Sequence, residues 1–141
     1  YAENKISHSI QPAGKLQLFK NDSIDIFQGD FFELTQEQTG LFEAIYDRGA
    51  IVALAQSERQ KYAEHLLSFL APGGRLLLIS LEYKQDQMSG PPFSVPDAEI
   101  AMLFSKYGNL ELLETCDILD ERLRNKGLDG ILERVYQLVK N

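Results

Sequence analysis

The sequence predicts an α/β protein built on one sheet with an antiparallel pair of strands at its end. Strand-like and helix-like segments alternate along the chain, as in folds where helices cover a sheet. The central segment Arg75–Leu81 is apolar without alternation, which is typical of a strand buried on both faces of a parallel sheet. Two further strand-like segments, Leu110–Ile118 and Ile131–Val139, follow near the carboxyl terminus. We expect residues 1–141 to form a single domain.

The first third of the chain reads as short strands separated by turns. Apolar side chains alternate over Lys15–Phe27, and Asn21-Asp22-Ser23 interrupts them, so two strands joined by a tight turn are expected. Gly29-Asp30 ends the second of these strands. Phe42–Tyr46 is a further short strand, with Asp47-Arg48-Gly49 at its carboxyl end. A side chain at such a strand end is placed where α/β folds bind ligands.

A helix is predicted between this strand and the central one. Ser57-Glu58-Arg59-Gln60 has the spacing of a capping box, which opens a helix. Pro72-Gly73-Gly74 stops it. Its apolar residues recur at helical spacing and form one face: Tyr62, Ala63, Leu66, Leu67 and Leu70.

A proline-rich loop follows the central strand and is the most distinctive part of the chain. Ser89–Pro96 contains three prolines and a glycine, and each proline fixes its own φ, so the loop is stiff. Phe93 stands at its centre. A stiff loop with an aromatic side chain at the carboxyl end of a strand suggests a cover over a ligand. Ser94 is expected to cap a helix that runs to about Tyr107, and Asp120–Lys126 is charged and could form a short helix.

Composition excludes several classes of partner. The net charge is −7, which argues against nucleic acid and anionic membranes, since both are bound by basic surfaces. No apolar run reaches the roughly 20 residues of a membrane span. The single cysteine, Cys116, excludes an internal disulfide and fits a cytoplasmic location. His8 and His65 lack the spacing of metal ligands, so no metal site is expected. Because the chain begins with Tyr1 and not methionine, we expect residues before it.

Four side chains are candidates for ligand contacts, and each has a plainer structural alternative. Arg48, at a strand end, could bind a carboxylate or stack on a ring, or could form a surface salt bridge. Asp30 could accept from a ligand amine, or cap a turn. Phe31 could pack on a flat ring, or belong to the core. Arg122 lies in a charged segment where arginines are usually solvated.

Several segments together resemble the thiopurine S-methyltransferase family, in order and over essentially the whole chain. The proline loop is the most specific of them, and two of the segments fit the bacterial members. The segments are Tyr46–Ala50, Lys61–His65, Pro72–Arg75, Tyr83–Ile100, and Asp120–Arg122 with Gly127.

The resemblance implies a class I, Rossmann-like methyltransferase sheet and S-adenosylmethionine as cofactor. It also implies aromatic or heterocyclic thiols as substrates, with selenium or tellurium compounds for some bacterial relatives. Arg48, Asp30 and Phe31 would contact the cofactor, the last two on its adenine side. The residues implied near the substrate are Arg48, Arg122, Pro92 and Phe93. No catalytic residue is expected, because aromatic thiols ionise easily and need no strong base.

The chain departs from the family pattern at its start. The family's glycine-rich cofactor loop and the acidic residue that binds ribose have no counterpart, so the chain resembles the carboxyl-terminal part of the domain. In the implied strand order 3-2-1-4-5-7-6, Ile24–Gln28 is strand 3 and Phe42–Tyr46 is strand 4, and strands 1 and 2 are lacking. Strand 4 would then have an unpaired edge, which preceding residues, another chain or a rearranged segment should cover. Without preceding residues, self-association through this edge is expected.

Two alternatives remain open from the sequence. One is a noncatalytic fragment of the methyltransferase fold, which would serve as an interaction domain and could not bind cofactor alone. The other is a class I methyltransferase that acts on oxygen or nitrogen.

Overall fold

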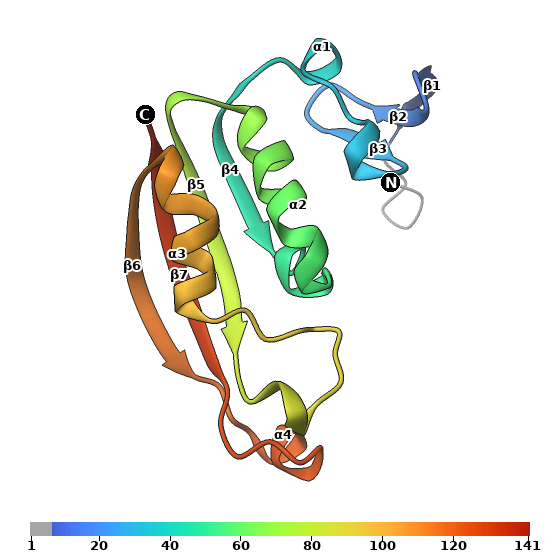
Figure 1. The fold of residues 1–141 in the computed structure, drawn as a ribbon. Helices are drawn as coiled ribbons and strands as arrows, with labels where there is room; N and C mark the ends of the chain where they lie inside the picture. Colours follow the sequence, from blue (N-terminus) through green and yellow to red (C-terminus); the bar gives the residue numbers. More distant parts are fainter. Residues whose placement is uncertain (1–6) are drawn as a thin grey trace. The chain divides into compact units, whose positions relative to one another are not determined.

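The chain divides into two compact units in a computed structural model that describes residues 7–141 (Figure 1). The first unit ends at Gly40 and the second comprises Leu41–Asn141. Residues 1–6 lie outside the described part, and with them Tyr1 and the expectation of residues before it. The expectation of a single domain stays a prediction, and each unit is described by itself.

The first unit is a small antiparallel sheet in the order β1-β2-β3, followed by two helical turns. Its elements are β1 (Ser9–Ala13), β2 (Leu16–Lys20), β3 (Asp25–Gln28), a 3₁₀ helix (Phe31–Glu33) and α1 (Gln36–Thr39). The predicted pair of strands and their turn are confirmed as β2 and β3. The Asn21 side chain closes the turn, because its Oδ1 accepts from the N–H groups of Ser23 and Ile24, both at 2.8 Å.

The place predicted for β3 in the family strand order stays a prediction. That order put the lacking strands 1 and 2 between Ile24–Gln28 and Phe42–Tyr46, and among the described strands β3 pairs only with β2 and none links it to β4. The strand β1 was not predicted, because Pro12 is unusual within a strand; it is tolerated here on the edge of the sheet.

The second unit is a four-stranded mixed sheet in the order β4-β5-β7-β6. The pair β4–β5 is parallel, and β7 runs antiparallel to both β5 and β6, so the predicted antiparallel end of the sheet is confirmed. Helices α2 and α3 touch each other and lie on one face of this sheet (Figure 1). The helices and strands of the unit are β4 (Phe42–Arg48), α2 (Gln56–Ser68), β5 (Leu70–Glu82), α3 (Asp97–Phe104), β6 (Gly108–Asp117), α4 (Glu121–Asn125) and β7 (Leu132–Lys140). No helix in the described part of the chain is long and apolar enough to cross a membrane.

The main core lies between the sheet and its two helices. Leu76, Leu78 and Ser80 of β5 are buried there, whereas Leu77 on the opposite face is 38% exposed. The prediction that β5 is buried on both faces is therefore wrong for the described residues, since α2 and α3 cover one face only. Pro72-Gly73-Gly74 is also not a plain stop signal, because it forms a bulge within β5 opposite β4.

The strand β4 forms one edge of the sheet, as expected for strand 4 of the implied order. Among the described strands only β5 pairs with it, so the expectation that a rearranged segment covers its outer edge is wrong for this part of the chain. Tyr46 of β4 is 59% exposed. Covering by another chain stays a prediction.

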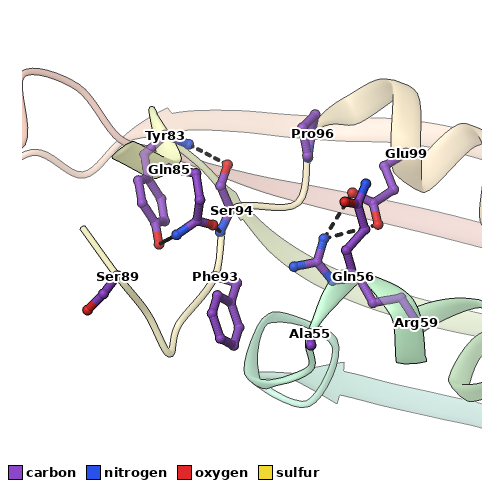
Figure 2. Close-up of a pocket in the computed structure, with 10 residues that line it drawn as sticks. All are labelled: Ala55, Gln56, Arg59, Tyr83, Gln85, Ser89, Phe93, Ser94, Pro96 and Glu99. Carbon is purple, nitrogen blue, oxygen red and sulfur yellow. Dashed lines mark hydrogen bonds and ion pairs between the residues drawn. The ribbon is translucent and has the colours of Figure 1, made fainter. Parts of the chain in front are cut away.

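A buried ion pair joins α2 to α3. Arg59 Nη1 lies 3.0 and 2.9 Å from the two carboxylate oxygens of Glu99 (Figure 2). Arg59 Nε donates to the Leu54 carbonyl. The side chains of the pair are 4% and 10% exposed. The helix starts at Gln56 without a side-chain cap, so the predicted capping box at Ser57 is wrong.

The start predicted for α3 is also wrong. Ser94 does not cap the helix, which begins at Asp97. Its hydroxyl instead accepts from the Tyr83 N–H at 3.0 Å, which ties the proline loop to the end of β5. The predicted apolar face of α3 is confirmed, since Ile100, Leu103 and Phe104 are buried.

Replacing Glu99 by alanine should strongly destabilise the protein, because Arg59 would keep a buried charge without its partner. Breaking a buried pair in this way costs about 3–5 kcal/mol. Asp129→Ala is the matched control, since its ion pair with Lys84 is exposed and should matter little. Denaturant unfolding measures both free energies. Equal values for the two variants would contradict the assigned role, and Arg59→Met combined with Glu99→Leu should recover much of the loss.

A second buried carboxylate, Asp47 near the end of β4, ties this strand to α2. It accepts from the Tyr62 hydroxyl at 2.7 Å and from the Ala50 N–H at 3.1 Å. Burial raises the pKa of Asp47, and the hydrogen bonds from Tyr62 and the backbone only partly oppose this. Folding therefore shifts Asp47 towards its protonated form relative to the unfolded chain.

This raised pKa predicts the direction of a pH effect on stability. As the pH rises from about 4, Asp47 ionises first in the unfolded chain, so its contribution to the free energy of unfolding falls until the folded-state pKa is passed. Asp47→Asn should remove this pH-dependent part of the free energy of unfolding, because an amide does not titrate. The amide can still accept from the Ala50 N–H and bond the Tyr62 hydroxyl, so the local structure is kept. The measurement is the free energy of unfolding of the wild type and of Asp47→Asn at several pH values, and the quantity compared is the difference between the two proteins at each pH. A difference that does not change with pH would contradict the assignment.

Candidate functional site

A cavity of about 440 Å³ opens at the carboxyl ends of β4 and β5, where the sequence placed a ligand. We call it the Arg48 cavity. Its walls are mostly apolar and come from the 3₁₀ helix Ile51–Ala53, from β5 and β7, and from the proline loop. The residues that line it are Arg48, Gly49, Val52, Ala53, Ile79, Leu81, Pro91, Pro92, Ile118 and Glu133.

Strand alternation brings Arg48 to this cavity. Asp47 points to the helix side and is buried, so its neighbour Arg48 must point to the opposite face of the sheet. Arg48 Nη2 lies 4.0 Å from Glu133 Oε2, and the Arg48 side chain is 65% exposed. The guanidinium therefore has one loose ionic neighbour and remains accessible to a ligand.

The proline loop forms one wall of the Arg48 cavity through Pro91 and Pro92, as predicted for Pro92. Phe93 does not line this cavity. It lines a second one of about 580 Å³, which we call the Phe93 cavity (Figure 2). Gly90 has a φ of +75°, and a Cβ on it would lie 2.5 Å from Phe93 Cδ1, so glycine is required where the ring folds back on the loop.

Arg122 lies on α4 and is not among the residues that line either cavity. Its side chain is 77% exposed, and its Nε is 4.0 Å from the Asp120 carboxylate. Asp120 itself caps α4 by accepting from the Leu123 N–H at 2.7 Å. The structure thus does not bring Arg122 and Arg48 into one cavity, and a substrate role for Arg122 stays a prediction.

Asp30 and Phe31 belong to the first unit. Asp30 Oδ1 accepts from the Phe32 N–H at 3.0 Å and so caps the 3₁₀ helix, which is the structural alternative for this residue. Phe31 is half-buried, and its ring centroid lies 5.9 Å from that of Phe32. A contact of either residue with a cofactor stays a prediction.

Two residues near the cavities, Glu133 and Arg59, were not recognised from the sequence. Glu133 was read only as a polar position of the final strand, although alternation with Val135 puts it on the face that carries Arg48. Arg59 could have been found from helical spacing, because it shares the buried face of Tyr62, Ala63 and Leu66. No signal in the sequence paired it with Glu99, 40 positions away.

The remaining polar groups offer no other chemistry in this region. No cluster of histidine, cysteine, aspartate or glutamate that could hold a metal ion occurs among residues 7–141. Cys116 is half-buried on β6, and its Sγ donates to Glu114 Oε1 at 3.3 Å. This hydrogen bond raises the pKa of the Cys116 thiol. The Arg48 cavity itself combines mostly apolar walls with the accessible Arg48 guanidinium and the Glu133 carboxylate.

Comparison with known proteins gives a consistent family. The family model for Thiopurine S-methyltransferase (TPMT) matches residues 1–141. The chain is 40% identical over 141 residues to a thiopurine S-methyltransferase of Pseudomonas fluorescens, matching 99% of this chain and 65% of that protein. It is 36% identical over 141 residues to the enzyme of that name from Bos taurus, matching 96% of this chain and 58% of that one.

Solved structures share the fold at low sequence identity. An arsenic (III) S-adenosylmethionine methyltransferase from Chlamydomonas reinhardtii matches with a TM-score of 0.58 at 19% identity, over 80% of this chain and 43% of that one. The N-methyltransferase NodS from Bradyrhizobium japonicum, in complex with S-adenosyl-L-homocysteine, matches with a TM-score of 0.52 at 14% identity, over 78% and 52% of the two chains. The predicted class I methyltransferase fold is thereby confirmed.

The chain spans about two thirds of the length of the Pseudomonas relative. The family match covers β4, the proline loop and α4, because it spans residues 1–141. The predicted relationship is confirmed: this chain belongs to the thiopurine S-methyltransferase family.

Proposed function

We propose that the protein containing this chain transfers a methyl group from S-adenosylmethionine to the sulfur of aromatic or heterocyclic thiols. The observation that carries the proposal is the Arg48 cavity, which combines apolar walls with one accessible guanidinium. Family membership supports the same reaction. Selenols and tellurols are further candidates, because they form anions more readily than thiols do.

The residues proposed for the cofactor have suitable chemistry. Asp30 is exposed and uses one carboxylate oxygen, Oδ1, for its helix cap, which leaves Oδ2 to accept from the adenine amine. Phe31 offers a ring beside it. Arg48 can pair with the carboxylate of the cofactor or with the substrate anion. We therefore assign Asp30, Phe31 and Arg48 to cofactor binding.

The protein's own contribution to the reaction is to bind and orient the thiol. S-Adenosylmethionine, when bound, supplies an electrophilic methyl group, which the thiolate sulfur takes as the bond from that carbon to the sulfonium sulfur breaks. Arg48 favours the thiolate over the neutral thiol, because its positive charge lies at the cavity. The apolar walls, including Pro91 and Pro92, exclude water and align the ring, and such alignment can supply roughly 7–11 kcal/mol in well-oriented cases.

Two parts of the proposal concern partners. The substrate is a small molecule, and no contact with nucleic acid or membrane is proposed. Self-association through the outer edge of β4 is a separate proposal that holds only if no preceding residues cover this edge, and it is supported by the lack of a second strand partner among the described residues.

A panel of acceptors tests the reaction. The complete protein with S-adenosylmethionine should methylate aromatic thiols and leave the matching phenols and anilines unchanged, because the thiols are ionised near neutral pH without a base. Transfer of the labelled methyl group to each compound is the measurement. Methylation of the phenols or anilines instead would favour an oxygen or nitrogen methyltransferase. If calorimetry detects no binding of S-adenosylmethionine to the complete protein, a noncatalytic domain would be favoured instead.

Arg48→Ala should raise the KM for a thiol substrate by roughly 10-fold. A hydrogen bond to a charged group contributes about 1.5–3 kcal/mol, and the exposure of Arg48 places its effect at the lower end. Arg75→Ala is the matched control, because Arg75 is an exposed arginine on the same face of the sheet at the opposite end of the β4–β5 pair. Unchanged KM values for both cofactor and thiol in Arg48→Ala would remove its assigned role.

A further inference from the structure

The proline loop is held by main-chain hydrogen bonds to three separate segments. The N–H groups of Phe93, Ser94 and Val95 donate to Val52 O at 2.6 Å, to Gln85 Oε1 at 2.8 Å and to Leu81 O at 2.7 Å. The prolines of the loop have no N–H to offer. These three donors therefore carry much of the attachment of the loop, and the middle one depends on a side chain.

The Gln85 side chain is fixed by partners that allow only one orientation. Its Oε1 accepts from the Ser94 N–H, and its Nε2 donates to the Met88 carbonyl at 2.7 Å. One partner can only donate and the other can only accept, so the amide cannot be turned around. The turn that carries Gln85, the 3₁₀ helix Gln85–Gln87, is thereby locked to the loop.

Tyr83 extends this chain of hydrogen bonds to the wall of the Arg48 cavity. Its hydroxyl donates to the Pro92 carbonyl at 2.6 Å and accepts from Gln85 Nε2 at 3.2 Å. Its main-chain N–H donates to the Ser94 hydroxyl. Figure 2 shows Tyr83, Gln85 and Ser94 joined in this way beside the Phe93 cavity. Pro92, one of the residues that line the Arg48 cavity, is thus held by the Tyr83 hydroxyl.

The tip of the proline loop lines two cavities, whereas the residues behind the tip are buried. Pro91 and Pro92 line the Arg48 cavity and Phe93 lines the Phe93 cavity, while Ser94 and Val95 are buried. Gln85 is itself exposed, so truncating it leaves no hole in the core. The hydrogen bonds with Tyr83 and Gln85 therefore anchor the tip directly, in addition to the packing of Val95.

We propose that Gln85 and Tyr83 are positioning residues that set the proline loop at the distance from Arg48 that a flat thiol requires. This rests on the proposed function. Neither residue touches the Arg48 cavity in the structure, so both act through Pro92 and Ser94. Loss of Gln85 should loosen the binding of the ring without changing the cofactor site.

The test compares Gln85→Ala with Gln87→Ala in the complete protein. Gln87 lies in the same turn, but its side chain accepts from the Asp129 N–H and not from the loop, which makes it a matched control. Gln85→Ala should speed hydrogen exchange of the Phe93 and Ser94 amides by roughly 10-fold, as expected for one lost hydrogen bond. It should raise the KM for the thiol several-fold more than it lowers kcat, with the affinity for cofactor and the unfolding midpoint nearly unchanged.

A conservative variant and the control decide the outcome. Gln85→Glu keeps the acceptor for the Ser94 N–H but loses both donors, so its KM and exchange rates should lie between those of the wild type and Gln85→Ala. Unchanged exchange and KM in Gln85→Ala, or equal changes in Gln87→Ala, would overturn the proposal. Faster exchange in a protein that methylates no thiol would support the anchoring of the loop and overturn the proposed function alone.

Discussion

The arrangement at the Arg48 cavity depends on the burial of one carboxylate. Asp47 lies on the helix side of β4 and accepts from Tyr62 on α2, which fixes both the rotation of the strand and the turn that follows it. Because neighbouring side chains of a strand point to opposite faces, the Arg48 side chain lies on the face opposite Asp47. The buried carboxylate of Asp47 on one side thus determines the position of the Arg48 side chain on the other.

The proline loop contributes residues to the walls of two cavities, and its backbone is nevertheless anchored. Stiff residues reduce the number of conformations that the loop can adopt, so few anchoring contacts are needed. The anchors lie where the backbone still has N–H groups, at Phe93, Ser94 and Val95, and they reach three segments that belong to the same unit. The buried ion pair of Arg59 and Glu99 holds α2 against α3 in the helical layer that covers the sheet.

Sequence reasoning was most successful where a local pattern determines structure. The strands β2 and β3, the strand β4 and the inner face of α3 follow from alternation or helical spacing and were placed correctly. It failed at Ser57, because α2 begins one residue earlier without a side-chain cap, and at Ser94, because the Ser94 hydroxyl accepts from the Tyr83 N–H instead. The placement of Pro92 and Phe93 in the walls of different cavities depends on the path of the loop, which residue types alone do not specify.

The charges at the cavity add a constraint on the ligand. Glu133 lies 4.0 Å from Arg48, too far for a hydrogen bond but close enough to balance the charge. An anion that enters the cavity must compete with the Glu133 carboxylate for Arg48, whereas a cation would be repelled by the Arg48 guanidinium. Under the proposed function, the thiolate would lie along the apolar wall of Ile79 and Leu81 with its sulfur towards the guanidinium. In that arrangement Glu133 would repel a highly charged anion more strongly than a singly charged one.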